Sequence, residues 1–327
     1  MAIADVAEVQ PELEHLRPQV RFSLLRALAR RKLAMLAIIY LAIFYLCGIF
    51  APLIAPYDPR AQELTLEARS AGPSADHWFG RDALGRDVFS RVIYSARTTI
   101  LFTVVVILTG GIFLGLGLGL LAGYKGGWVD TLIMRIGEIL AGLPTLILML
   151  AITASFRTQI NDAAFSLADN TWLSVDEART FIKFFIIVGA TVPFAWVGSS
   201  RIVRSQVLSI REQTYVVAAE AMGASTWRIL FRHILPGVLP IFIVGLSAGM
   251  ASLAGAEVAL SYLGLGIDEP ASSFGNLLNQ VQSPYTFSQY PHLLLAPAIP
   301  VILFFYAWNL LGDALVDILE PRANQAR

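Results

Sequence analysis

The chain has 327 residues, of which 56% are hydrophobic and only 15% are charged, and its mean hydropathy is positive. Soluble globular domains rarely have this composition, so the sequence predicts an integral membrane protein. The formal net charge is zero, which gives no overall attraction for nucleic acid or for an acidic substrate. The single cysteine, Cys47, excludes an intrachain disulfide.

The N-terminal segment, residues 1–32, is polar and ends in three consecutive basic residues. The apolar run 33–55 that follows is longer than the core of a signal peptide and long enough to cross a bilayer, which takes about 20 residues. We interpret it as an uncleaved first span that forms a unit, 33–97, with the external loop behind it. The stretch RDVFSRVIYSARTTI (86–100) has a basic side and an apolar side. It is either a short helix along the membrane interface or an extension of the next span.

Five further runs have the length and apolar character of membrane spans, and six spans place both termini on one side. These runs are 100–123, 132–154, 181–199, 237–260 and 291–312. Lys and Arg are retained on the cytoplasmic side. The segment 200–236 contains five arginines, whereas 264–290 contains no Lys or Arg. We therefore expect cytoplasmic termini, including the tail 319–327, and a cytoplasmic 200–236. The external segments are then 56–99, 156–180 and 264–290, although 56–99 contains six arginines balanced by six acids.

Patterns that would indicate catalysis are absent from the sequence or lie in the wrong setting. The dinucleotide-like glycine pattern at 115–122 lies inside a span, where Gly111, Gly115 and Gly119 instead predict a smooth helix face for close packing. No G-x-x-x-x-G-K-[ST] motif occurs, and the four histidines are scattered. We therefore expect no enzyme activity, no cofactor and no metal site, with ATP hydrolysed by a separate partner.

A few ionisable residues and prolines fall within or near the spans, where an unpaired charge is expensive. Arg135 and Glu138 are three residues apart and can pair on one face of the third span. Pro144 interrupts the hydrogen bonds of the same span. Glu257 lies near the outer end of the fifth span, and Asp313 near the inner end of the sixth. For the charged residues we favour interfacial placement or local pairing over contact with substrate.

The segment YVVAAEAMGASTWRILFRHILP (215–236) predicts a short helix, a tight turn and a second helix. Residues 213–222 favour a helix, Gly223 can adopt the left-handed conformation that ends it, and Ser225 can cap the next helix. Pro236 then closes that helix. Small side chains leave a low surface on which another protein can dock. The candidate docking residues are Tyr215, Ala218, Ala219, Glu220, Gly223, Ala224, Ser225 and Arg228.

This segment resembles the cytoplasmic "EAA" loop of binding-protein-dependent ABC importer permeases. The family pattern is Glu-Ala-Ala, three residues, Gly, and a Leu-Pro about a dozen residues later. Its alanines, glycine and final Leu-Pro match Ala218, Ala219, Gly223 and 235–236. Val217 occupies the glutamate position, so the resemblance implies the docking role without a specific glutamate contact.

Four other stretches resemble the second permease subunit, the C-type subunit, of dipeptide and oligopeptide importers: 77–98, 123–148, 259–278 and 309–322. The resemblance implies an all-α polytopic membrane protein with six transmembrane helices, one N-terminal helix and a five-helix core over 98–318. It also implies a second permease as heterodimer partner, two ATP-binding subunits, an extracytoplasmic substrate-binding protein and surrounding membrane lipid in a bacterial inner membrane. The implied cargo is a di- or oligopeptide, with an oligosaccharide or a metal chelate as alternatives. The rival mechanism is an ion-coupled secondary transporter.

Overall fold

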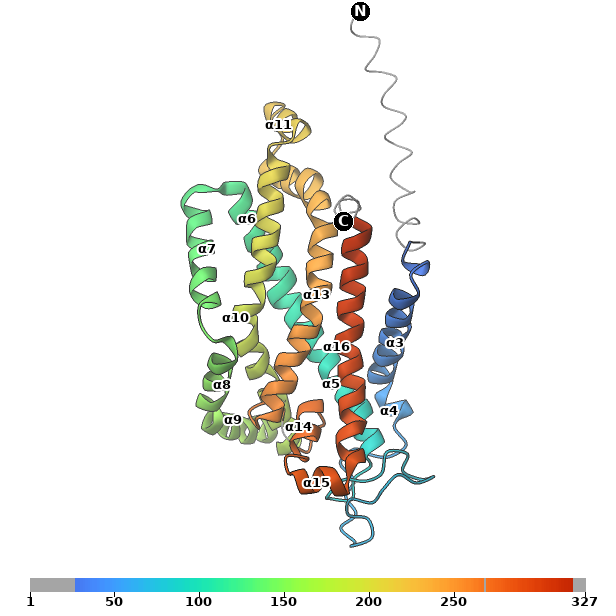
Figure 1. Ribbon diagram of the computed structural model, residues 1–327. Helices are drawn as coiled ribbons and strands as arrows, with labels where there is room; N and C mark the ends of the chain where they lie inside the picture. The colour runs from blue at the N-terminus through green and yellow to red at the C-terminus, as the bar shows by residue number, and fades with distance from the viewer. Residues whose placement is uncertain (1–26, 268, 320–327) are drawn as a thin grey trace, which may run out of the picture.

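A computed structural model describes residues 27–267 and 269–319. Across these residues the chain forms a bundle of helices without a β-strand (Figure 1). The helices of the first half are α3 (Lys32–Ile49), α4 (Ala51–Ile54), α5 (Val88–Val106), the π-helix η1 (Ile107–Leu116), α6 (Gly117–Lys125), α7 (Gly127–Ala141), α8 (Thr145–Ser155) and α9 (Arg157–Asp169). Those of the second half are α10 (Val175–Arg211), α11 (Thr214–Ala221), α12 (Thr226–Arg228), the π-helix η2 (Ile229–Ile234), α13 (Leu235–Tyr262), α14 (Phe274–Asn279), α15 (Pro284–Gln289) and α16 (Pro291–Leu319).

Within the described residues, the helices are long and apolar enough for six membrane crossings if one broken span is counted. Five continuous helical stretches are long and apolar enough to cross: Lys32–Ile49, Val88–Lys125, Val175–Arg211, Thr226–Tyr262 and Pro291–Ile318. The sixth crossing is the pair α7 and α8, which bend by 84° at their junction. Pro144 is the N-cap of α8, because its fixed backbone angle and missing N–H do not continue α7. The third predicted span is therefore interrupted at the proline.

The expected first span, 33–55, is helical over Lys32–Ile49 and Ala51–Ile54, whereas 88–97 is not a separate interfacial helix. The helix begins at Val88 and continues without a break to Lys125, and its N-cap residue, Asp87, accepts a side-chain hydrogen bond from the Ser90 N–H. Ser95 and Arg91 on this stretch are fully buried by protein. A basic residue that is buried in this way cannot contact lipid headgroups, so the stretch extends the second span.

The glycines of the second span pack against α10, with a register that the sequence alone did not indicate. A Cβ at Gly115, Gly119 or Gly123 would approach α10 side-chain atoms to between 2.6 and 2.7 Å. Gly110, not Gly111, occupies the preceding position, 2.8 Å from Ala195 Cβ by the same measure. Gly111 also packs closely against a neighbouring helix, but that helix is α13, where a Cβ would lie 3.0 Å from Leu246 Cδ2. The π-helix η1 has more residues per turn than an α-helix, which changes the glycine spacing on the α10 side from four to five at this point.

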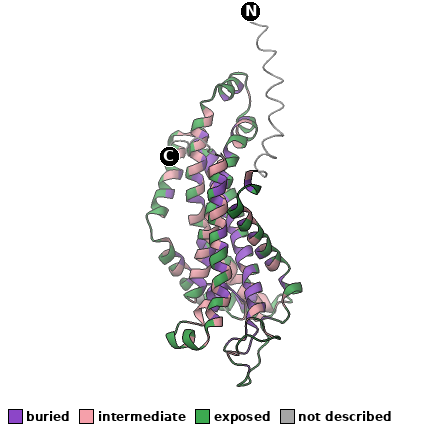
Figure 2. Ribbon diagram, turned by 45° about the vertical axis from the view of Figure 1, so that its right-hand side comes forward, coloured by how far each residue is buried: buried purple, intermediate pink, exposed green. Residues whose placement is uncertain are grey.

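Elements from distant parts of the sequence meet at the two ends of the bundle. Helix α11 lies at one end, whereas α14, α15 and the loop before α5 lie at the other (Figure 1). An ion pair between Arg31 and Asp317 joins the start of α3 to the end of α16. Buried residues gather inside the bundle and exposed residues alternate along its outer helix faces, as Figure 2 shows. Exposed Leu36, Ile39 and Ile43 on α3 form a surface suited to lipid.

Candidate functional site

The end of the bundle that contains α11 forms a compact projection between two long spans. Helix α10 runs to Arg211, and α11 follows after a short turn. Gly223 has φ of +80°, as predicted. Its N–H donates to the Glu220 carbonyl over 2.9 Å, and the Ala224 N–H donates to the Ala219 carbonyl over 3.0 Å. This pair of bonds is the Schellman motif, which satisfies carbonyls at the end of α11 and fixes its length.

One face of α11 is anchored on the bundle. Val216 and Ala219 are buried, and Val216 belongs to a cluster that joins α6, α10, η2 and α13 through residues such as Val207 and Ile234. Ala219 was predicted on the docking surface, but the helix periodicity turns it inward beside Val216. Ala224 is half-buried. The exposed members of the predicted set are Tyr215, Ala218, Glu220, Gly223, Ser225 and Arg228.

The predicted second helix begins after Ser225 as expected but differs from the structure in two details. Ser225 is the N-cap residue of α12, but its side chain accepts no capping hydrogen bond. Pro236 does not close a helix, because α12, η2 and α13 form one continuous span over Thr226–Tyr262. Pro236 lies inside this continuous helix, directly after the π-helix η2, where the regular pattern of α-helical hydrogen bonds is already interrupted. The projection is therefore continuous with the fifth span.

Large apolar side chains, which the sequence reasoning did not select, are exposed on the same projection. Val217 and Met222 are 52% and 83% exposed, and Trp227 is 70% exposed. The ring centroids of Trp227 and Phe231 lie 4.1 Å apart. The sequence could have indicated them, because the arginines of 200–236 predict a segment outside the membrane. Large apolar side chains in such a segment are typical of a protein contact surface. The projection thus offers both small and large apolar groups to a partner.

A cavity of about 590 Å³ lies between η1, α8, α10 and α13. Its walls are largely apolar, and none of its lining residues has a charged side chain. The hydroxyl groups that line it belong to Thr145, Thr191, Ser199 and Ser252. Such a surface can form hydrogen bonds with a cargo through its hydroxyl groups, but it has no charged group that would bind an oppositely charged cargo tightly.

The predicted pathway residues do not converge on this cavity. Pro144 adjoins its lining residue Thr145. Arg135 and Glu138 form the expected ion pair, 3.1 Å between Nη1 and Oε2, but on an exposed face of α7. Glu257 is fully buried rather than interfacial, and its carboxylate accepts hydrogen bonds from Thr99 at 3.2 Å and Ser261 at 2.9 Å. Asp313 is exposed on α16.

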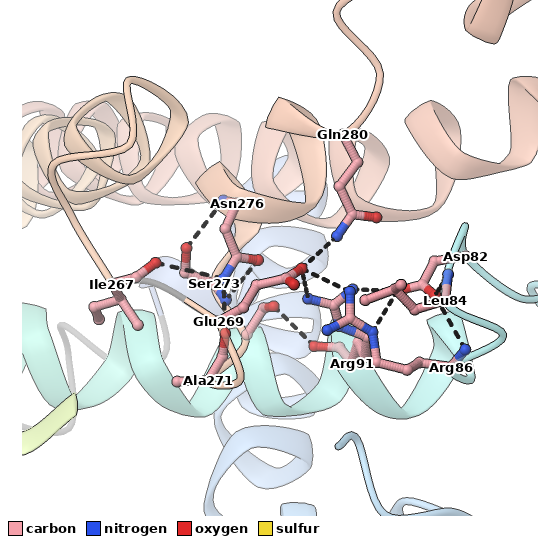
Figure 3. A network of polar contacts seen from close by, with 11 residues as sticks. Asp82, Leu84, Arg86, Arg91, Ile267, Glu269, Ala271, Ser273, Asn276 and Gln280 are labelled. Carbon is pink, nitrogen blue, oxygen red and sulfur yellow. Dashed lines mark hydrogen bonds and ion pairs between the residues drawn. The ribbon is translucent and has the colours of Figure 1, made fainter. Parts of the chain in front are cut away.

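A polar network, shown in Figure 3, fastens the loop after α13 to the start of α5. Asp82 accepts a hydrogen bond from Arg86 Nε over 2.8 Å and one from Arg91 Nη1. Glu269 Oε1 accepts from Arg86 Nη2 over 2.6 Å, from Arg91 Nη2 over 3.1 Å and from the Gln280 amide over 2.8 Å. Two buried cations thus share two carboxylates, so this basic loop contributes little net charge.

The pKa values of the network residues outside the spans follow from these contacts. Burial acts to raise the pKa of Glu269, but the hydrogen bond from Arg86 and the charge of Arg91 outweigh it and lower the pKa. Burial acts to lower the pKa of Arg86, but contact with Glu269 and Asp82 raises it above its ordinary value. Both groups are held in their charged forms.

Comparison with known proteins identifies the class to which this bundle belongs. The family model "Binding-protein-dependent transport system inner membrane component" matches residues 115–325. The model "N-terminal TM domain of oligopeptide transport permease C" matches residues 23–73. The chain therefore belongs to the binding-protein-dependent transport permeases and is a permease subunit of an ABC importer.

Individual relatives cover almost the whole chain. A dipeptide transport system permease protein of Bacillus subtilis is 36% identical over 297 residues, which cover 91% of this chain and 84% of the relative. A glutathione transport system permease protein of Pectobacterium atrosepticum is 33% identical, with 91% and 89% covered. An oligopeptide transport system permease protein of Bacillus subtilis is 33% identical, with 89% and 86% covered.

Proposed function

We propose that this subunit forms one half of a translocation pathway for di- or oligopeptides and that a second permease forms the other half. The names of the three relatives, which refer to a dipeptide, glutathione and an oligopeptide, support a peptide cargo. The uncharged cavity agrees with this cargo, because peptides of different side chains share a backbone that hydroxyl groups can bond. Selection then rests mainly on an extracytoplasmic binding protein.

The anchoring of α11 is the observation that carries the proposed mechanism. Two separate ATP-binding subunits hydrolyse ATP, and one of them docks on the exposed face of α11 in this subunit. Because Val216 and Ala219 fix α11 to the junction of α10 and α13, movement of the docked subunit displaces both spans. A loosely attached loop would absorb that movement instead.

Uptake by the complete transporter tests this function. The subunit is reconstituted in proteoliposomes with the second permease, the two ATPase subunits and the binding protein of the same importer. We expect ATP-dependent uptake of a labelled dipeptide or pentapeptide, and none when an ATPase subunit is omitted. Uptake of a labelled oligosaccharide or nickel chelate without peptide uptake would replace the proposed cargo.

The proposed orientation places both termini and α11 in the cytoplasm of a bacterial inner membrane. Single cysteines at Asn170, Glu212 and Tyr285, in a Cys47→Ser background, test it, because all three positions are exposed. We expect an impermeant thiol reagent added to intact spheroplasts to label 170 and 285 and to spare 212. Labelling of 212 alone would invert the topology.

A further inference from the structure

Helix α7 attaches to the bundle along only one of its faces. Ile133 and Gly137 are buried on this helix. A Cβ at Gly137 would lie 3.4 Å from Val197 Cγ1 and 3.5 Å from Trp196 Cη2, both on α10. Val129, Asp130, Met134 and Leu140 are half-buried, and the other residues along α7 are exposed in this subunit. The chemistry of these exposed residues indicates what they face in the assembled transporter.

A second face of α7 is an apolar stripe suited to lipid. Its members recur at helical spacing and all have large side chains: Trp128, Leu132, Ile136 and Ile139 on α7, followed by Leu143 just beyond the end of the helix. Their exposed fractions range from 42% for Leu143 to 76% for Trp128. A tryptophan at the start of such a stripe is typical of the boundary between membrane and water. Trp128 therefore marks the level from which depth along α7 is measured.

The third face of α7 is polar and lies between the other two. It contains Thr131, Arg135 and Glu138, which are all exposed. The side chains of the Arg135 and Glu138 ion pair are 71% and 56% exposed. Arg135 lies seven residues beyond Trp128, which is about 10 Å deeper along a helix. An exposed charge pair at that depth is strongly disfavoured in hydrocarbon, so this face needs water or protein.

The position of the polar face favours water. Beyond α7, the chain bends by 84° and Thr145, Leu146 and Met149 of α8 enter the wall of the uncharged cavity. The polar face of α7 thus lies on the same broken span as that wall, on the α11 side of the break (Figure 1). Thr131 satisfies its own hydroxyl through the Gly127 carbonyl over 3.1 Å, so it does not require a partner protein.

We propose that Thr131, Arg135 and Glu138 line the inner part of the translocation pathway and present a matched cation and anion to the cargo. This inference rests on the proposed transport function and narrows its cargo. A peptide with a free carboxylate and a free ammonium group replaces the Arg135–Glu138 contact pairwise, whereas a cargo with one charge leaves one member of the pair without a counterion. The cargo class is therefore a zwitterion.

Thiol accessibility on α7 tests the placement. Cysteines replace Thr131, Arg135 or Glu138 one at a time in the Cys47→Ser background, and Leu132, Ile136 and Ile139 give matched controls on the apolar stripe. The complete transporter in proteoliposomes is treated with a hydrophilic thiol reagent. We expect the polar positions to react about tenfold faster than the controls, because the reagent does not enter hydrocarbon. We also expect uptake to be lost after modification, and a transported peptide to slow the labelling.

The outcomes separate this inference from the proposed function. If wild-type uptake of peptide is intact but the polar positions react no faster than the controls, a protein surface covers them and the inference is wrong. If the wild-type transporter takes up no peptide at all, the proposed function fails whatever the labelling shows. Uptake of an N-acetylated and an amidated peptide tests the cargo class. If Arg135→Gln lowers the uptake of blocked peptides and of free peptides by the same factor, the ion pair does not recognise a zwitterionic cargo and the inference is refuted.

Discussion

The left-handed glycine that ends α11 provides a graded test of the coupling mechanism. We propose to replace Gly223 by Asn, Ala or Val. The residue has φ of +80° and lies in the turn that returns the chain to the fifth span. Asparagine adopts this conformation more readily than other side chains, whereas a β-branched residue adopts it least readily. The three substitutions therefore differ mainly in the backbone conformation that each permits.

The magnitude follows from the surroundings of this glycine. A Cβ at Gly223 would meet no atom within 4 Å, so a clash inside the subunit contributes nothing. The left-handed conformation alone destabilises the turn by about 1–2 kcal/mol for an ordinary side chain, and by less for Asn. Two hydrogen bonds of the Schellman motif depend on this turn. Relief of the strain would release the last turn of α11, while the spans, held by their own packing, remain intact.

Two measurements on the purified transporter check the expected order. Retention of the ATPase subunits in detergent and peptide uptake per ATP hydrolysed should decrease from wild type through Asn and Ala to Val. Permease levels in the membrane should be equal for all four proteins. Wild-type retention and coupling in Gly223→Val would refute the assignment of α11 as the coupling element. Reduced membrane levels of all variants would instead indicate a folding defect.

Two further predictions concern packing and charge. Gly119→Val should destabilise the subunit by about 1–3 kcal/mol because its Cβ would lie 2.6 Å from an α10 side chain, whereas Gly117→Val, with no atom within 4 Å, should be near neutral in thermal unfolding. Glu269→Gln should lower the thermal stability, since the buried Arg86 and Arg91 lose one of two carboxylates. Because the folded pKa of Glu269 is lowered, its contribution should be complete above the usual carboxyl pKa of about 4.3 and be lost as pH falls further. If the difference in thermal stability between wild type and Glu269→Gln is the same at neutral and at acidic pH, this reasoning is contradicted.

The membrane class and the spans were predictable from the sequence because both depend on local composition. A stretch of apolar residues must cross a bilayer regardless of its neighbours, since its backbone groups find no water there. The turn at Gly223 was predictable for a similar reason, because a left-handed residue at a helix end depends on short-range sterics. The break at Pro144 depends on the same kind of local restriction.

Several errors had a common origin in contacts between distant segments. The inward direction of Ala219 depends on the cluster that α11 joins, and the continuity of the helix through Pro236 depends on how the fifth span begins. Gly110, and not Gly111, contacts α10 because of a π-helical segment that no residue pattern predicted. Local propensity contains no information on any of these three features.

The arginines of residues 56–99 show most clearly what only the tertiary structure decided. Their number conflicted with an external loop when Lys and Arg were simply counted, because such a count treats each charge as free. Folding brings Glu269, from a loop more than 170 residues away, to within 3.1 Å of both Arg86 and Arg91. The sequence by itself determined which segments enter the membrane, because transfer to hydrocarbon depends on each segment alone. The structure decided which charges neutralise one another and which remain exposed, because electrostatic energy depends on distance in space.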